Sequence, residues 1–182
     1  MRSHMHKLVF TALVGICTLS GVAAYVGARP AVAGWREIAW PFPRDGWPAG
    51  RAFRCNAALC GGEVELYVRP KIGFCNCDSG VADDDEVDRV ADLDLISERF
   101  AALEPGRAVR VADMSGRIRN YHLQMQDGSR HAAVGIALSR RCDLLVVAAQ
   151  GRAAGSGLQH IALDFLAKED VTRWMTAALD GR

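Results

Sequence analysis

Hydrophobic and polar residues alternate with a period of two along much of the middle of this chain. Four stretches show the pattern: 63–69, 107–112, 117–126 and 131–138. A period of two is typical of half-buried β-strands. Pro70 and Gly73 are expected to interrupt the first strand, and turns are expected at 114–116, at the Asp-Gly pair 127–128 and at 139–141. The last three strands and 144–149 therefore predict an antiparallel meander.

Apolar runs and helical spacing predict the remaining elements. The run 144–149 is continuously apolar, which predicts a central strand covered on both sides. Apolar residues in 158–166 and 171–179 recur at helical spacing, and Asp83 with Glu86 three residues later predicts the start of a short helix. Strands first and helices last predict an α+β fold, an antiparallel meander sheet with helices packed on it.

Aromatic and proline residues dominate the stretch 35–48. The mixture is too stiff for a helix and too apolar for a flexible tail, so we expect it to lie extended across the core. Trp40 and Trp47 have a second interpretation, as an exposed recognition patch.

The opening "PFPRDGW", the four-strand meander and a closing helix that contains Val171-Thr172-Arg173-Trp174 resemble the secreted PsbP-like domains. The resemblance covers most of residues 34–182 and depends on the order of the elements. It implies an α/β/α sandwich of the kind used by small accessory and binding subunits, and it implies no active-site residues. The cysteines depart from that pattern.

The first 33 residues have the pattern of a secretory leader. Arg2 and Lys7 precede an almost uncharged run, 8–28, and small residues at 31 and 33 follow Pro30. We expect residues 1–33 to be a signal peptide cut before Gly34, which leaves 34–182 as a single disulfide-braced α+β domain. An uncleaved membrane anchor is the alternative, because the run is about 20 residues long. The protein is then periplasmic or secreted, or anchored in the inner membrane facing the periplasm.

Charge excludes one class of partner and predicts one internal contact. Without the leader the chain has 19 basic and 21 acidic residues, a net charge of −2, which does not indicate a nucleic-acid partner. Acidic residues dominate 78–98 and arginines follow over 99–119, so the two segments are expected to neutralise each other. A calcium loop at Asp83 and Asp85 is the alternative, although it lacks the glycine of an EF-hand.

Five cysteines follow the leader: Cys55, Cys60, Cys75, Cys77 and Cys142. Export favours disulfides, and we expect the first pair to bond to the second, either nested (60 with 75, 55 with 77) or crossed (55 with 75, 60 with 77). Each bridge would stabilise the fold by about 3 kcal/mol. Cys142 is either a buried free thiol or the partner of a cysteine in the cluster.

A metal site is the functional alternative for the same thiols. Cys75 and Cys77 could bind copper(I), joined by Met114, Met125, His122 or His131. No cofactor is otherwise expected. The chain contains no haem, zinc-protease, phosphate-loop or Gly-x-Ser-x-Gly motif.

The sequence therefore predicts a non-enzymatic periplasmic accessory or binding protein of the cell envelope, with an envelope protein as the expected partner and an unidentified ligand. Membrane contact is expected only if the leader is uncleaved. The runner-up is a copper metallochaperone or thiol-redox protein that uses Cys75 and Cys77. A hydrolytic enzyme, with a nucleophile beside His122, His131 or His160, is the third class.

Overall fold

A computed structural model describes residues 34–43, 45–73, 79–152 and 155–181 of the chain. The expected leader, Cys75 and Cys77 lie outside these residues. The strands are β1 (Trp35–Ile38), β2 (Arg51–Cys55), β3 (Val64–Lys71), β4 (Phe100–Ala102), β5 (Arg107–Val111), β6 (Met114–Gln124), β7 (Arg130–Arg140) and β8 (Asp143–Gly151). The helices are α2 (Ala57–Cys60), α3 (Asp84–Val90), α4 (Leu93–Ile96), α5 (Gly155–Leu166) and α6 (Glu169–Leu179). None of these helices is long and apolar enough to cross a membrane.

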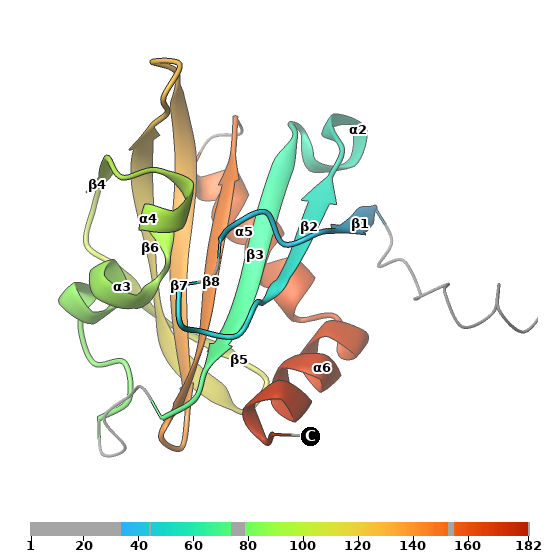
Figure 1. Ribbon diagram of the computed structural model, residues 1–182, viewed down its shortest axis with the longest axis vertical. Coiled ribbons are helices and arrows are strands. Elements are labelled where there is room, and N and C mark those ends of the chain that lie inside the picture. The colour runs from blue at the N-terminus through green and yellow to red at the C-terminus, as the bar shows by residue number, and fades with distance from the viewer. Residues whose placement is uncertain (1–33, 44, 74–78, 153–154, 182) are drawn as a thin grey trace, which may run out of the picture. The chain divides into compact units, whose positions relative to one another are not determined.

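The strands form one eight-stranded sheet in which every pair is antiparallel (Figure 1). The order is β1-β2-β3-β8-β7-β6-β4, and β5 pairs with the first part of β6. Strands β5 to β8 make the predicted meander, and the α+β class is confirmed. The last strand of the meander, β8, pairs with the earlier strand β3 along the whole length of β3.

Two predicted turns are displaced. Met114 begins β6, and the turn is made by Ala112 and Asp113, where Ala112 has a φ of 51°. Gly116 lies inside β6, where the residue must be glycine because a Cβ would overlap the carbonyl oxygen of Ala137 on β7. The glycine permits close approach of two strands, which the sequence pattern alone cannot distinguish from a turn. Likewise β7 continues through Arg140, which pairs with Asp143.

Strand β8 contributes side chains to two separate cores. Leu145, Val147 and Ala149 belong to the core on the side of α5 and α6, which supply buried Leu158, Phe165 and Met175, among others. The alternate residues Leu144, Val146 and Ala148 belong to the core on the side of α3. Figure 1 shows α3 and α4 on one face of the sheet and α5 and α6 on the other. The prediction of a central strand covered on both sides is confirmed.

The segment between β1 and β2 crosses the α3 face of the sheet (Figure 1). We call residues 39–43 and 45–50 the strap. The rings of Trp40 and Phe42 pack edge-on against Tyr67 of β3, with centroids 6.1 and 4.8 Å away. The expectation that the aromatic opening lies across the core is confirmed.

Strand β3 does not end where proline was expected to end it. Pro70 is part of β3 and pairs with Leu145 of β8. On its other side, β2 pairs with β3 only as far as Val68. Pro70 therefore occupies an edge position, where a missing N–H removes no ladder hydrogen bond.

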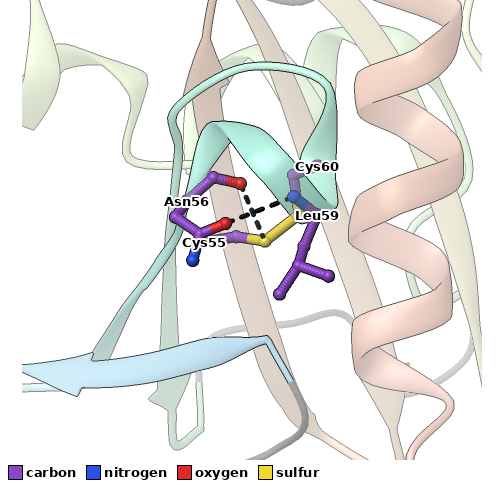
Figure 2. The surroundings of a disulfide bond; sticks show 4 residues. All are labelled: Cys55, Asn56, Leu59 and Cys60. Carbon is purple, nitrogen blue, oxygen red and sulfur yellow. Dashed lines mark hydrogen bonds between the residues drawn. A yellow bond between two sulfur atoms is a disulfide. The ribbon is translucent and has the colours of Figure 1, made fainter.

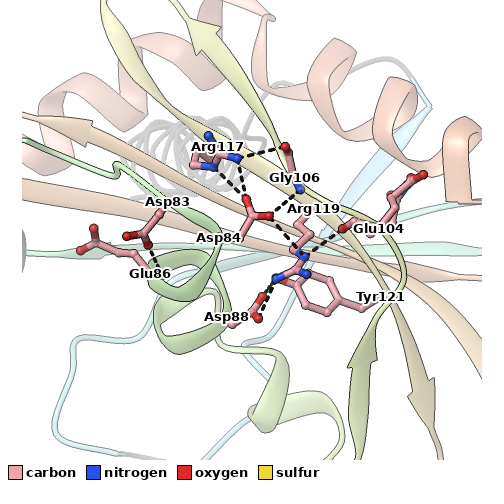
Figure 3. A network of polar contacts seen from close by, with 10 residues as sticks. Asp83, Asp84, Glu86, Asp88, Glu104, Gly106, Arg117, Arg119 and Tyr121 are labelled. Atoms are coloured by element: carbon pink, nitrogen blue, oxygen red, sulfur yellow. Dashed lines mark hydrogen bonds and ion pairs between the residues drawn. The ribbon is translucent and has the colours of Figure 1, made fainter.

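Ion pairs hold helix α3 against β6 (Figure 3). They join the acidic segment, which contains α3, to arginines of the basic segment that follows it. Asp83 caps the helix by accepting a hydrogen bond from the amide of Glu86 at 2.9 Å. Arg117 binds Asp84 at 2.6 Å, and Arg119 binds Asp88 at 2.8 Å. The predicted neutralisation is confirmed. The calcium-loop alternative is wrong, because residues 84–90 are helical.

Candidate functional site

The β6–β7 hairpin extends beyond the helices (Figure 1). Three hollows are lined by its residues. The hairpin groove, about 560 Å³, lies between residues 94–99 and residues 124–131, with Arg152 at its wall. A hollow of about 520 Å³ adjoins it over β3 and β8 and shares His131 and Arg152. A third, about 550 Å³, is lined by His122 and Arg130. This end of the sheet is the candidate site.

A row of polar side chains supports His131 at the junction of the first two hollows. Its Nδ1 lies 3.2 Å from Oε1 of Gln150, and Nε2 of Gln150 donates to Oε2 of Glu65 at 3.1 Å. Tyr67 donates to the same Glu65 oxygen, and Arg54 donates to the other. Because Gln150 pairs with Glu65, and Glu65 with Arg54, the row crosses adjacent strands on one face.

The charge of Glu65 is fixed by these contacts. Burial works to raise the pKa of Glu65, but the hydrogen bonds from Tyr67 and Arg54 outweigh it and hold the pKa below its usual range. Burial and the bond to Glu65 both raise the pKa of Tyr67. Near neutral pH the tyrosine keeps its proton and Glu65 is a carboxylate, which can only accept hydrogen bonds.

The carboxylate in turn fixes the protonated nitrogen of His131. Since Glu65 only accepts, the amide nitrogen of Gln150 must face Glu65, and its oxygen Oε1 must face His131. Nδ1 of His131 therefore carries the hydrogen and donates it. In the neutral imidazole, Nε2 is left with a lone pair.

Arginines without a salt bridge gather at this end of the protein. Arg99, Arg130 and Arg152 line the three hollows, and within the described residues none of them makes an ion pair. Elsewhere most described arginines are paired, with carboxylate distances of 2.5 to 2.8 Å at Arg51, Arg54, Arg69, Arg117, Arg119 and Arg140. The exceptions are Arg36, Arg107 and Arg110, which are spread over other parts of the sheet. The hairpin end thus carries three guanidinium groups that form no ion pair within the described residues, although the pKa of the Asp127 carboxyl group is lowered by hydrogen bonds from Ser129 and, at a distance, by the charge of Arg152.

No protein-family model matches the chain, and no curated protein matches it. Among solved structures, the chain is similar to a Pseudomonas aeruginosa protein of unknown function that is described as a candidate regulator. The two share 15% sequence identity over 70% of this chain and 86% of the other, with a TM-score of 0.44.

The residues proposed as metal ligands are separated by the fold. Met114 is fully buried in the core beneath α5 and α6. His122 is exposed, eight residues along the same strand, a distance of about 26 Å at 3.3 Å per residue. Those two side chains do not share an ion. Met125 and His131 both line the hairpin groove. A site at Cys75 and Cys77 lies outside the described residues and remains a prediction.

The two tryptophans of the strap lie over buried cations. The guanidinium of Arg69 is 5.7 Å from the Trp40 ring centre, and Nζ of Lys71 is 5.8 Å from that of Trp47. Both tryptophans are half-buried. They cover the core, and a role for the pair in recognition remains a prediction.

Sequence reasoning missed the cations beneath the strap. Arg69 and Lys71 are only 2% and 5% exposed, and both bind the carboxylate of Asp92, at 2.7 and 2.6 Å. Arg69 also binds Asp45 at 2.8 Å. Their burial could have been predicted from their spacing in the sequence. Arg69 and Lys71 follow Tyr67 at intervals of two residues, so they lie on the same face of β3 as that buried side chain. Their pairing with Asp92 has no local signal in the sequence.

His160 lies outside the candidate site. Its ring is exposed on α5 and contacts Asp164, four residues later, at 3.1 Å. The side-chain contacts found for His131 and His160 in the described residues are to Gln150 and Asp164. A hydrolytic function remains a prediction without a described residue pair to carry it.

Cys55 and Cys60 form a disulfide with each other (Figure 2). Both belong to a bridge as predicted, but the nested and crossed pairings are both wrong for them. Asn56 caps the single turn of α2, and this turn brings Cys60 back to a Cα separation of 6.1 Å from Cys55. Cys142 is exposed in the β7–β8 turn and is disulfide-bonded, so it is not a buried free thiol.

Replacing Cys55 and Cys60 together by alanine is expected to lower the free energy of unfolding by about 2 kcal/mol. The closed loop is short, so the chain-entropy gain is smaller than for the pairings expected from sequence. Urea denaturation measures the change. Leu59→Ala, at a 66% exposed position in the same turn, is the control and should change stability by less than about 0.5 kcal/mol. An unchanged double variant would show that the bridge does not stabilise the fold.

Proposed function

We propose that this protein is a non-enzymatic accessory protein of the cell envelope that binds a protein partner at the hairpin end of its sheet. In this proposal the leader directs the chain to the periplasm or out of the cell. The resemblance to PsbP-like domains supports the same role, because small accessory subunits use that fold.

One observation carries the proposal: the contrast between paired and unpaired arginines. Ion pairs hold α3, β2 and the strap in place, whereas Arg99, Arg130 and Arg152 surround the hairpin without salt bridges in the described chain. Unpaired arginines beside hollows are suited to carboxylates of another protein, since guanidinium groups bind carboxylates through two parallel hydrogen bonds. The two disulfides support export, because such bonds persist in oxidising compartments.

A photo-crosslinking amino acid at Gln126 tests the proposal in living cells. Gln126 is exposed near the tip of the hairpin, and we expect it to give one discrete crosslinked product in the periplasmic fraction. Glu169, whose side chain is 89% exposed on α6, is the control position and should give none. The product should weaken when Arg99, Arg130 and Arg152 are changed to glutamine.

Equal crosslinking from both positions, or none from Gln126, would count against a binding surface at the hairpin. Recovery of the chain only from the cytosol would count against the envelope location.

A further inference from the structure

Two side chains with metal-binding atoms, His131 and Met125, belong to the same face of the hairpin. His131 is directly opposite Leu123, and Met125 follows the end of β6, two residues after Leu123. Met125 and Leu123 both pack toward the α3 face, and the backbone of Met125 is hydrogen-bonded to Ser129. His131 and Met125 are thus diagonal cross-strand neighbours, a separation that long side chains span. Both line the hairpin groove.

The imidazole is already held as a metal ligand would be. Nδ1 donates to Gln150, whose amide donates to the Glu65 carboxylate, so Nε2 keeps its lone pair. A ligating histidine usually has its other nitrogen hydrogen-bonded in this way, which fixes both the ring orientation and the tautomer. Tyr67 and Arg54 hold Glu65 in turn.

The donor atoms select the ion. An imidazole nitrogen and a thioether sulfur are both neutral, and thioethers favour copper(I) over harder ions. Calcium or magnesium would need several oxygen ligands. Among the described residues, no group of three histidine, cysteine, aspartate or glutamate side chains could hold a metal. A site at His131 would therefore need another kind of donor, and the thioether of Met125 is the soft donor that lines the same groove.

We propose that the hairpin groove binds one copper(I) ion through Nε2 of His131 and the sulfur of Met125, with Gln150 as a positioning residue. The site differs from the cysteine pair considered from the sequence. It shares the hairpin groove with Arg99 and Arg152, but its test does not need the proposed partner, because the isolated protein should bind the ion.

Titration of the full exported protein, with its disulfides intact, against a chromophoric copper(I) chelator tests the site with copper(I) alone. We expect one equivalent bound, with the affinity lowered at least tenfold in His131→Asn and in Met125→Leu. Leucine fills nearly the volume of methionine, so the second variant removes sulfur without disturbing the packing. Gln150→Leu should lower the affinity about tenfold or more, as loss of such a supporting contact does.

His122→Asn is the matched control, since His122 is an exposed histidine of the same hairpin, on β6, and does not line the groove. It should leave copper affinity unchanged. In the wild-type protein, copper(I) should also shift the ring-proton NMR signals of His131 and not those of His122.

The site is disproved if the wild-type protein binds no copper(I), or if Met125→Leu, folded as judged by circular dichroism, binds it with wild-type affinity. Binding that survives His131→Asn but disappears in Cys75→Ser/Cys77→Ser would overturn it in favour of the cysteine pair.

Discussion

Replacing Asp92 by asparagine is expected to lower the free energy of unfolding by about 3 kcal/mol or more. The carboxylate is the shared partner of Arg69 and Lys71, with contacts of 2.7 and 2.6 Å, and both cations are almost completely buried. In the variant Arg69 keeps Asp45 and Lys71 keeps its hydrogen bond to the Val90 carbonyl oxygen, but both lose the carboxylate that they share. Breaking a buried ion pair by removing one partner typically costs about 3 to 5 kcal/mol. Urea denaturation followed by tryptophan fluorescence measures the loss.

Asparagine is the appropriate replacement because Asp92 has a φ of 58°. Asparagine tolerates this left-handed conformation well, so the variant changes the charge without adding backbone strain. Asp45→Asn is the matched control. Its carboxylate pairs with one cation, Arg69, and accepts a hydrogen bond from the backbone amide of Trp47 at 3.2 Å. The Asp45 side chain is 28% exposed, and we expect a loss of only about 1 kcal/mol.

Equal losses in the two variants would show that the strap contact, and not the buried pair, carries the stability. A change below about 1 kcal/mol in Asp92→Asn would show that water or a rearranged side chain already compensates the two cations.

Replacing Gly116 by alanine is expected to cost about 3 kcal/mol, at the upper end of the range for overpacking. Gly116 lies in β6 between Val109 of β5 and Leu138 of β7. The added Cβ would overlap the carbonyl oxygen of Ala137 and lie 2.8 Å from the Cα of Leu138. These are backbone atoms of the paired strand, so the clash cannot be relieved by rotating a side chain. The β6–β7 ladder would have to open locally.

Gly157→Ala is the control for this substitution. No atom lies within 4 Å of a Cβ at Gly157, which is in the first turn of α5, and its φ is not positive. Alanine there should be neutral or stabilise by up to about 1 kcal/mol. Thermal denaturation of both variants makes the comparison. A Gly116→Ala protein as stable as Gly157→Ala would mean that β6 and β7 do not approach this closely.

The elements with a clear period were predictable from sequence, and the ones that depend on distant partners were not. The strand 63–69, the meander and the helices at 83–91, 158–166 and 171–179 all appear, with shifted ends. Strands β1, β2 and β4 and helices α2 and α4 were missed, because each has only three to five residues and shows less than one full repeat of a pattern.

The candidate site was predictable only in its parts. His131 and Met125 were named among possible metal ligands, but so were Met114 and His122, which the structure places elsewhere. Gln150 and Glu65 were not named, because their contact with His131 depends on β3 lying beside β8, more than seventy residues away along the chain.

By itself the sequence determined the local elements and the two-sided burial of β8, because these depend on the order of polar and apolar side chains along a short stretch of chain. The tertiary structure alone decided which strands are neighbours, which carboxylates neutralise Arg69 and Lys71, and which sulfur bonds to Cys55. Those choices are contacts in space. They are selected by the free energy of the whole packed fold, to which residues far apart in the sequence contribute together.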